Sequence, residues 1–500
     1  MRPRPSQEDD RQQLLRTRRD FIRQASCAAV GGIAIANSIR DFRLINSVLA
    51  QGGGGLTDYK ALVCIFMSGG NDCNNFIVPR GADYTTYQSA RGNLAIPEGA
   101  LHALSPLNDD GHTYGFHPSC GELATLFGEN KLAIQFNVGP LLFPTTRDQY
   151  KRKLVALPPQ LFSHSDQVTH WQTSLPDQPP KTGWGGRVAD ILHSQQPSAQ
   201  ISLCTSVSGS NTFEVGDSTQ QYHVSTTGAV LLSGVAQNRL ATMRSIIDGS
   251  QTTTPDTNLQ GRAYADAMEK AIVTGQTLNT AVEPTRDTGT APIPWTWATP
   301  FPNTTLGNQL KMVARLIAAR NQLTMKRQIF FVSVGGYDTH TAQVGNAANP
   351  SGTPDAPLFG SHANLLNELS EAIFAFQRGV EQIAGHAVLG DAQLGQKVTA
   401  FTASDFGRTY PTNGQGSDHG WGSHHIVVGG GVNGRRTFGT FPILQVNGPN
   451  DTSTGRWIPT TAVDEYSATL AKWFGVPTSG LSTVFPNLGR FVTQDVGFML

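Results

Sequence analysis

Short apolar runs recur along the chain, separated by longer segments in which apolar residues return every three or four positions. The run LVCIF at residues 62–66 is apolar at every position, which is typical of a parallel strand covered on both faces. We expect strands at residues 61–67, 131–137, 200–204, 328–334, 397–403 and 425–429. We expect helices at residues 118–127, 306–325, 362–378 and 463–474. This alternation predicts an α/β fold with a doubly wound, mostly parallel sheet.

Residues 205–305 have a different composition, rich in Thr, Ser, Asn and Gln, with a Pro-rich stretch at residues 292–302. We interpret this region as an inserted cap at the edge of the sheet. Helices are expected within it near residues 230–247 and 261–278.

The N-terminal segment matches a twin-arginine export signal. Arg18 and Arg19 are followed by a polar residue, Phe and Ile, and then by a mildly apolar stretch at residues 25–39. That stretch is too short and too polar to remain as a membrane span. Cleavage is expected near Ala50, so residues 1–50 are predicted to be a signal peptide. We therefore expect the twin-arginine translocase as a partner and a periplasmic or secreted protein with no permanent membrane span.

Composition narrows the remaining chain, residues 51–500, to one large α/β domain. Over all 500 residues, the 37 basic and 37 acidic residues give a net charge of zero, which argues against a nucleic-acid partner because such a partner requires a basic surface. The four cysteines beyond the signal are scattered and form neither a disulfide framework nor a CxxC zinc pattern. They are Cys64, Cys73, Cys120 and Cys204.

Clusters of Asp and His follow the expected strands. Residues 68–75 contain Asp72, residues 335–340 contain Asp338 and His340, and residues 404–409 contain Asp405 and Arg408. A fourth cluster, residues 417–425, contains Asp418 and His419 and leads into the next strand. Because the carboxyl ends of parallel strands share one edge of a sheet, these clusters are expected to converge.

Converging carboxylates and imidazoles are the ligands of a divalent metal site. Mixed Asp and His ligands suit zinc or manganese, whereas carboxylates alone suit magnesium or calcium. Each cluster alone is also ordinary turn or helix-capping chemistry, but four together favour a metal site. The candidate ligands are Asp72, Asp338, His340, Asp405, Asp418 and His419.

Two further residues are candidates for catalysis. Ser163, three residues before Asp166, is either the N-cap of a helix or a nucleophile activated at a helix N-terminus, with Ser165 as a competitor. Arg408 is placed either to bind a phosphate or sulfate group or to form an ordinary ion pair.

These motifs, in this order over nearly the whole chain, resemble the secreted bacterial proteins of the domain of unknown function 1501 (DUF1501) family. The motifs are the twin-arginine leader, residues 68–75, Ser163 with His164, residues 337–340, residues 404–409 and residues 418–421. That family is similar to the alkaline phosphatase and sulfatase superfamily. The resemblance implies an alkaline phosphatase-like fold.

The same resemblance implies roles for individual residues: Asp72 as the ligand after the first strand, Ser163 at the nucleophile position, Asp338 and His340 as a pair on a second metal, Asp405 as a ligand on the bridging side, and His419 as the last ligand. Three departures limit it. The Asp and His on the second metal of alkaline phosphatases are more widely spaced than Asp338 and His340. Phe406 follows Asp405 where alkaline phosphatases carry His, and the sulfatase signature for a formylglycine nucleophile is absent.

The sequence therefore predicts an extracytoplasmic, metal-dependent hydrolase of phosphate or sulfate esters, with a small-molecule or glycan ester as substrate. The alternative is a non-catalytic metal- or carbohydrate-binding accessory protein on the same fold, since a fold does not determine an activity.

Overall fold

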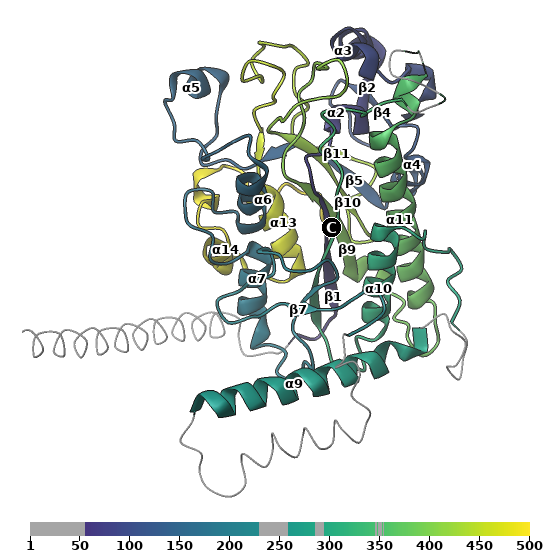
Figure 1. Ribbon diagram of the computed structural model, residues 1–500, viewed down its shortest axis with the longest axis vertical. Helices are drawn as coiled ribbons and strands as arrows, with labels where there is room; N and C mark the ends of the chain where they lie inside the picture. Colours follow the sequence, from purple (N-terminus) through teal and green to yellow (C-terminus); the bar gives the residue numbers. More distant parts are fainter. Residues whose placement is uncertain (1–55, 230–258, 286–294, 346–347, 349–352, 354) are drawn as a thin grey trace, which may run out of the picture. The chain divides into compact units, whose positions relative to one another are not determined.

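A central sheet covered by helices on both faces organises the computed structural model (Figure 1), which describes residues 56–229, 259–285, 295–345, 348, 353 and 355–500. Residues Gly55–Leu500 pack as one unit. The expected signal peptide, residues 1–50, and the helix expected near residues 230–247 lie outside the described residues.

The central sheet is largely parallel. Its order is β11-β5-β10-β9-β1-β8-β6-β7, with β12 also paired to β5, and only β10 runs antiparallel to its neighbours. The mixed α/β class with a mostly parallel sheet is therefore confirmed. The strands are β1 (Lys60–Met67), β5 (Leu132–Gly139), β6 (Cys204–Ser206), β7 (Tyr222–His223), β8 (Arg327–Val334), β9 (Val398–Ser404), β10 (Ser423–Val428), β11 (Thr437–Phe438) and β12 (Thr461–Ala462).

The sequence of β1 explains how the sheet is covered. Alternate residues of this strand point to opposite faces, so an uninterrupted apolar run supplies both cores. Ala61, Val63 and Ile65 belong to the core beneath α4 (Gly121–Gly128), α10 (Thr305–Ala318) and α11 (Ser361–Ala384). Leu62, Cys64 and Phe66 belong to the core beneath α6 (His164–Thr173), α7 (Trp184–His193), α13 (Val463–Phe474) and α14 (Thr478–Val484). Figure 1 shows these two helical layers on either side of the sheet.

Smaller elements complete the described part of the chain. A second, antiparallel sheet has the order β2-β4-β3. Its strands are β2 (Ile77–Arg80), β3 (His102–Ala103) and β4 (Thr113–Phe116), and the remaining helices are α2 (Cys73–Phe76), α3 (Tyr84–Arg91), α5 (Arg147–Arg152), α9 (Leu259–Val282) and α12 (Leu394–Lys397). Short 3₁₀ turns lie at Gly81–Asp83, Gly92–Leu94, Glu98–Ala100, Glu283–Thr285, Ala356–Leu358 and Leu488–Arg490.

Most expected elements lie within a few residues of the observed ones, but one strand is displaced. The strand expected at residues 200–204 begins only at Cys204 and continues to Ser206. The Ser202 hydroxyl donates to the Gln220 carbonyl and accepts from the Cys204 N–H, which keeps the preceding residues in a loop. In the region expected to be a cap, β7 extends the edge of the central sheet, and the long helix α9 contains the helix expected at residues 261–278.

Within the described ranges, Cys64, Cys73, Cys120 and Cys204 are buried and form no disulfide. No helix among the described residues combines the length and apolar character that crossing a membrane requires.

One buried carboxyl group makes the fold sensitive to pH. Glu214 belongs to the segment that connects β6 to β7. None of its surface is exposed, and Asn211 Nδ2 donates to its Oε2 at 2.8 Å. Burial raises the pKa of Glu214 to about 8, against 4.5 for an ordinary glutamate, even though the Asn211 hydrogen bond lowers it. Between these values the folded protein holds a proton that the unfolded chain releases, so the free energy of unfolding falls as pH rises.

Glu214→Gln should remove this contribution, because a neutral amide of the same shape has no proton to lose. We expect the melting temperature of the variant to rise relative to the original protein as the pH is raised from about 5 to about 8. Glu98→Gln, at a side chain that is 36% exposed, is the control and should show no such trend. A difference between Glu214→Gln and the original protein that stays constant with pH would show that Glu214 is not protonated in the fold.

Candidate metal centre

The central strands end at one level, which places their loops together. Met67 at the end of β1 is in register with Val334 of β8 on one side and with Ser404 of β9 on the other. The loops that carry Asp338 and Asp405 therefore begin on either side of the loop that follows β1, at the carboxyl edge of the parallel strands.

Gly69 lets the β1 loop approach its neighbour closely. Its φ of +115° is in the region that favours glycine, and a Cβ atom there would lie 2.4 Å from the backbone nitrogen of Asp338. Its N–H donates to Asp405 Oδ1 at 3.1 Å. The glycine is therefore required for the two loops to meet.

Three imidazole nitrogens surround the Asp338 carboxylate. Nε2 of His340 lies 3.2 Å from Asp338 Oδ1, and Nε2 of His419 lies 3.3 Å from the same oxygen. Nε2 of His164, the first residue of α6, lies 3.4 Å from Asp338 Oδ2. We refer to His164, Asp338, His340 and His419 as the His/Asp cluster.

Each histidine of the cluster is oriented by a hydrogen bond on its other nitrogen. His164 Nδ1 lies 2.7 Å from Asp405 Oδ2, His340 Nδ1 lies 2.9 Å from Asp418 Oδ1, and His419 Nδ1 lies 2.8 Å from the Phe162 carbonyl. A carboxylate or a carbonyl can only accept, so all three Nδ1 atoms carry the hydrogen. The lone pair of each neutral ring is then on Nε2 and faces the cluster, which is the arrangement found around metal-binding histidines.

The distances from the three histidines to Asp338 suit a small divalent ion. Ligands about 2.0–2.1 Å from a tetrahedral zinc ion lie about 3.3 Å from one another, close to the three distances to Asp338. His164 Nε2 is buried and makes no hydrogen bond among the described residues. The Nε2 atoms of His340 and His419 face each other at 2.8 Å, and their lone pairs repel unless a proton or a metal ion lies between them. Ligand atoms of His164, Asp338 and His419 all lie within 4.8 Å of one another.

Nearby charges and hydrogen bonds favour the ionised form of Asp338 in the cluster and of Asp418 behind it. Burial raises the pKa of Asp338, but the hydrogen bond and charge of Arg408, whose Nη1 is 2.8 Å from Oδ1, outweigh it, and the pKa is lowered. The pKa of Asp418 is also lowered, because hydrogen bonds from Asn413 and His340 outweigh its burial.

The histidines respond in opposite directions. The hydrogen bond to Asp405 raises the pKa of His164 against the effect of burial, whereas burial lowers the pKa of His419. The rings of both lie against Phe406, with centroids 4.8 Å and 4.7 Å away. Phe406 thus forms an apolar wall beside these two histidines.

The structure divides the expected ligands into three groups. Asp338, His340 and His419 come together directly. Asp405 and Asp418 lie behind them and contact the cluster through the histidines.

Asp72 is engaged elsewhere. It is fully buried and forms an ion pair with Arg91, and Gln343 Nε2 donates to its Oδ2 at 2.5 Å. Its other oxygen accepts from the N–H of Asn74, so Asp72 caps α2. Since these partners occupy both oxygens, we leave Asp72 out of the candidate ligand set.

The N–H groups of Arg408 are also occupied by hydrogen bonds within the protein. Its buried guanidinium donates to the carbonyls of Gly69 and Ser417 as well as to Asp338. It holds three loops together and has little hydrogen-bonding capacity left for a substrate.

Ser163 precedes His164 of the His/Asp cluster at the start of α6. It occupies the N-cap position, but its side chain makes no capping hydrogen bond. Its Oγ instead donates to Asp166 Oδ2 at 2.5 Å and lies 3.2 Å from Ser165 Oγ.

His164 is the functional candidate that strand patterns alone missed. It follows no strand, because α6 brings it across the sheet edge. The available signal was its position directly after Ser163, in a motif already singled out for chemistry.

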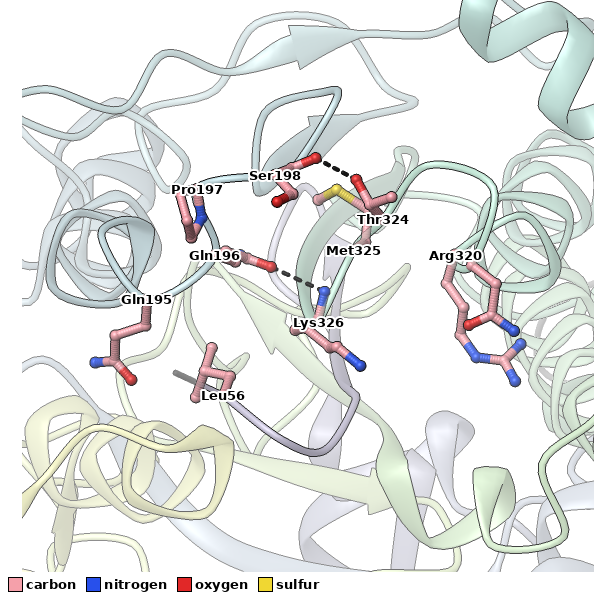
Figure 2. A pocket seen from close by; sticks show the side chains of 10 residues that line it. Leu56, Gln195, Gln196, Pro197, Ser198, Arg320, Thr324, Met325 and Lys326 are labelled. Atoms are coloured by element: carbon pink, nitrogen blue, oxygen red, sulfur yellow. Dashed lines mark hydrogen bonds between the residues drawn. The ribbon is translucent and has the colours of Figure 1, made fainter. Parts of the chain in front are cut away.

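A separate cavity of about 330 Å³ lies at the opposite end of β1 and β8 (Figure 2). Its lining includes Leu56, which precedes β1, and Lys326, which precedes β8, together with Gln196, whose side-chain oxygen accepts from the Lys326 N–H at 2.8 Å. None of its lining residues belongs to the His/Asp cluster.

Comparison with known proteins gives a family and distant likenesses to solved structures. The crystal structure of PsFucS1 sulfatase from Pseudoalteromonas sp. has a TM-score of 0.29 and 10% sequence identity over 89% of this chain and 72% of that chain, too distant to assign a fold type or an activity. No curated protein matches the sequence. The model of the family described as "Protein of unknown function (DUF1501)" matches residues 59–454. Since this match spans most of the chain, the protein belongs to the DUF1501 family.

Proposed function

We propose that this protein is a metal-dependent hydrolase of phosphate or sulfate esters that acts outside the cytoplasm. The observation that carries the proposal is the convergence of three Nε2 atoms on Asp338, each on a ring whose Nδ1 is already held by an acceptor. Export by the twin-arginine translocase and an alkaline phosphatase-like type of fold are parts of the same proposal. The Arg18–Arg19 motif supports the first, and the placement of Asp and His at strand ends supports the second.

The ligand set selects among the candidate ions. Three imidazoles and one carboxylate suit zinc or manganese, whereas magnesium and calcium prefer oxygen ligands. We therefore propose zinc or manganese, held by His164, Asp338, His340 and His419. Asp405 and Asp418 orient two of these histidines and increase their basicity.

When bound, such an ion acts as a Lewis acid that polarises an ester oxygen of the substrate. The residues of the chain supply the rest. Phe406 shields one side of the histidines from water, and Arg408 fixes Asp338 while offsetting its charge.

Ser163 is the proposed nucleophile. Its hydroxyl is one residue from His164 and donates to the Asp166 carboxylate, which is placed to accept the proton when the oxygen attacks. The hydroxyl is also not used for capping.

His164→Asn tests the metal site. The amide nitrogen of Asn overlays Nδ1 and retains the donor to Asp405, but the variant lacks Nε2. We expect metal affinity to fall by more than about 100-fold, the upper range for loss of an outer-sphere partner alone. Metal content after dialysis against zinc or manganese buffers is the measurement.

His112→Asn is the matched control, because His112 pairs with Asp83 at 2.7 Å on the surface, outside the cluster. It should retain the full metal content. Full metal content in His164→Asn would remove His164 from the ligand set.

Asp72→Asn separates the two roles of that residue. The change leaves Arg91 buried without its counter-charge, so the free energy of unfolding should fall by about 3–5 kcal/mol. Metal content at low temperature should be unchanged, because Asp72 lies outside the cluster. Denaturant unfolding and metal analysis are measured on the same sample.

A double variant tests whether the loss of stability comes from the unpaired charge of Arg91. Arg91→Met combined with Asp72→Asn removes both charges and should recover part of the stability. Loss of metal from Asp72→Asn with little loss of stability would restore Asp72 as a ligand.

Ser163→Ala tests the nucleophile. Turnover of phosphate or sulfate esters should fall by several orders of magnitude while metal content stays intact, because the ligands lie on other residues. Ser165→Ala is the control and should retain most activity. Near-normal turnover in Ser163→Ala would exclude this hydroxyl as the attacking group.

A screen of phosphate and sulfate esters also tests the alternative function. The original protein should turn over at least one ester class when loaded with metal. Full metal content without turnover of any ester would favour the non-catalytic accessory protein.

A further inference from the structure

Arg456 is fixed at the rim of the His/Asp cluster. Its Nε donates to the carbonyl of His419 at 2.7 Å, and its guanidinium carbon lies 4.2 Å from the centre of the Phe162 ring. The same two residues are joined at the cluster, where Phe162 accepts from His419 Nδ1. The guanidinium is thus held against the residue that precedes Ser163 and against one proposed ligand.

The backbone of Arg456 is fixed as well. Its N–H donates to Asp451 Oδ1 at 2.9 Å, and its carbonyl accepts from the N–H of Thr452 at 3.1 Å. The adjacent Trp457 forms a bridge with Asp451, and its carbonyl accepts from the N–H of Gly422 in the segment that carries His419. A side chain fixed at its backbone and at Nε loses little conformational entropy when it binds a ligand.

The outer end of this guanidinium has no hydrogen-bond or ion-pair partner among the described residues. Nε donates to the His419 carbonyl, whereas Nη1 and Nη2 make no such contact within that part of the chain. The side chain is half-buried. Arg408 differs, since its donors are engaged by Gly69, Asp338 and Ser417.

We propose that Arg456 binds the tetrahedral oxyanion of the substrate, the role first expected of Arg408. Two parallel N–H groups of a guanidinium match two oxygens of a phosphate or sulfate, and a charge held beside a metal site adds to the attraction. Stacking on Phe162 fixes the plane of the guanidinium, in which these two N–H groups form a fork. This assignment rests on the proposed function, because the oxyanion belongs to the ester that the cluster cleaves.

Anion binding to the metal-loaded full-length protein tests the assignment. Inorganic phosphate and inorganic sulfate are titrated separately by calorimetry into the original protein and into Arg456→Met, Arg456→Lys and Arg490→Met. Arg490 is the matched control, because it also lies over a phenylalanine ring, Phe143 at 4.9 Å, but pairs with Asp177 at 3.2 Å. Metal content and melting temperature are recorded for each protein.

We expect Arg456→Met to weaken binding of the preferred anion at least about tenfold, the effect of losing a hydrogen bond to a charged group. Arg456→Lys should show an intermediate loss, because it keeps the charge without the fork, and Arg490→Met should match the original protein. Metal content and melting temperature should be unchanged throughout. The anion that binds more tightly identifies the ester class.

Three results would overturn the assignment: unchanged affinity in Arg456→Met, no binding of either anion by the original protein, or a loss of anion affinity that always accompanies a loss of metal or of stability. The last would make Arg456 a structural support for His419. Arg456-dependent anion binding in a protein that takes up no metal would refute the proposed function and leave the anion site standing.

Discussion

Three hydrogen bonds on the Nδ1 atoms of His164, His340 and His419 determine what this site can do. Each fixes one tautomer and turns the opposite nitrogen towards Asp338. Without them the rings could rotate, and facing lone pairs at 2.8 Å would separate the histidines. The acceptors come from the β9 loop, the loop before β10 and the residue before Ser163, so the folding of three separate segments is needed to prepare one metal-sized space.

Charged side chains around the site hold the same residues in place. Asp338 is the shared acceptor, and Arg408 offsets its charge while joining the loops that follow β1 and precede β10. A second set of contacts lies deeper: Asp72 binds Arg91 and Gln343, and Gln343 in turn accepts from the Ser417 hydroxyl. Asp72, which was expected to bind metal, therefore stabilises the loop that contains Ser417. The carbonyl of Ser417 accepts hydrogen bonds from Arg408. Because Arg408 is used in this way, the proposed contact with substrate passes to Arg456.

The sequence predicted the central strands well because β1, β8 and β9 are buried along nearly their whole length. β1 carries an uninterrupted apolar run, and β8 and β9 are rich in apolar and β-branched residues. It also placed Asp338 and Asp405 together, since parallel strands end at one edge. It did not find His164, because the position of α6 over that edge depends on packing of Trp171 against His425 and Tyr466. It could not show that Arg91, nineteen residues away, neutralises Asp72. Strand-end position predicts neighbours, but hydrogen-bond partners decide which neighbours remain free to bind a ligand.

X-ray absorption at the zinc edge identifies the atoms that bind the ion. The protein is loaded with zinc, freed of excess metal and measured in solution at neutral pH. If His164, Asp338, His340 and His419 hold the ion, we expect one ion per chain with three imidazole nitrogens and one carboxylate oxygen at about 2.0–2.2 Å. A first shell dominated by oxygen, or one that keeps three imidazoles in a His164→Asn variant with full occupancy, would contradict this ligand set.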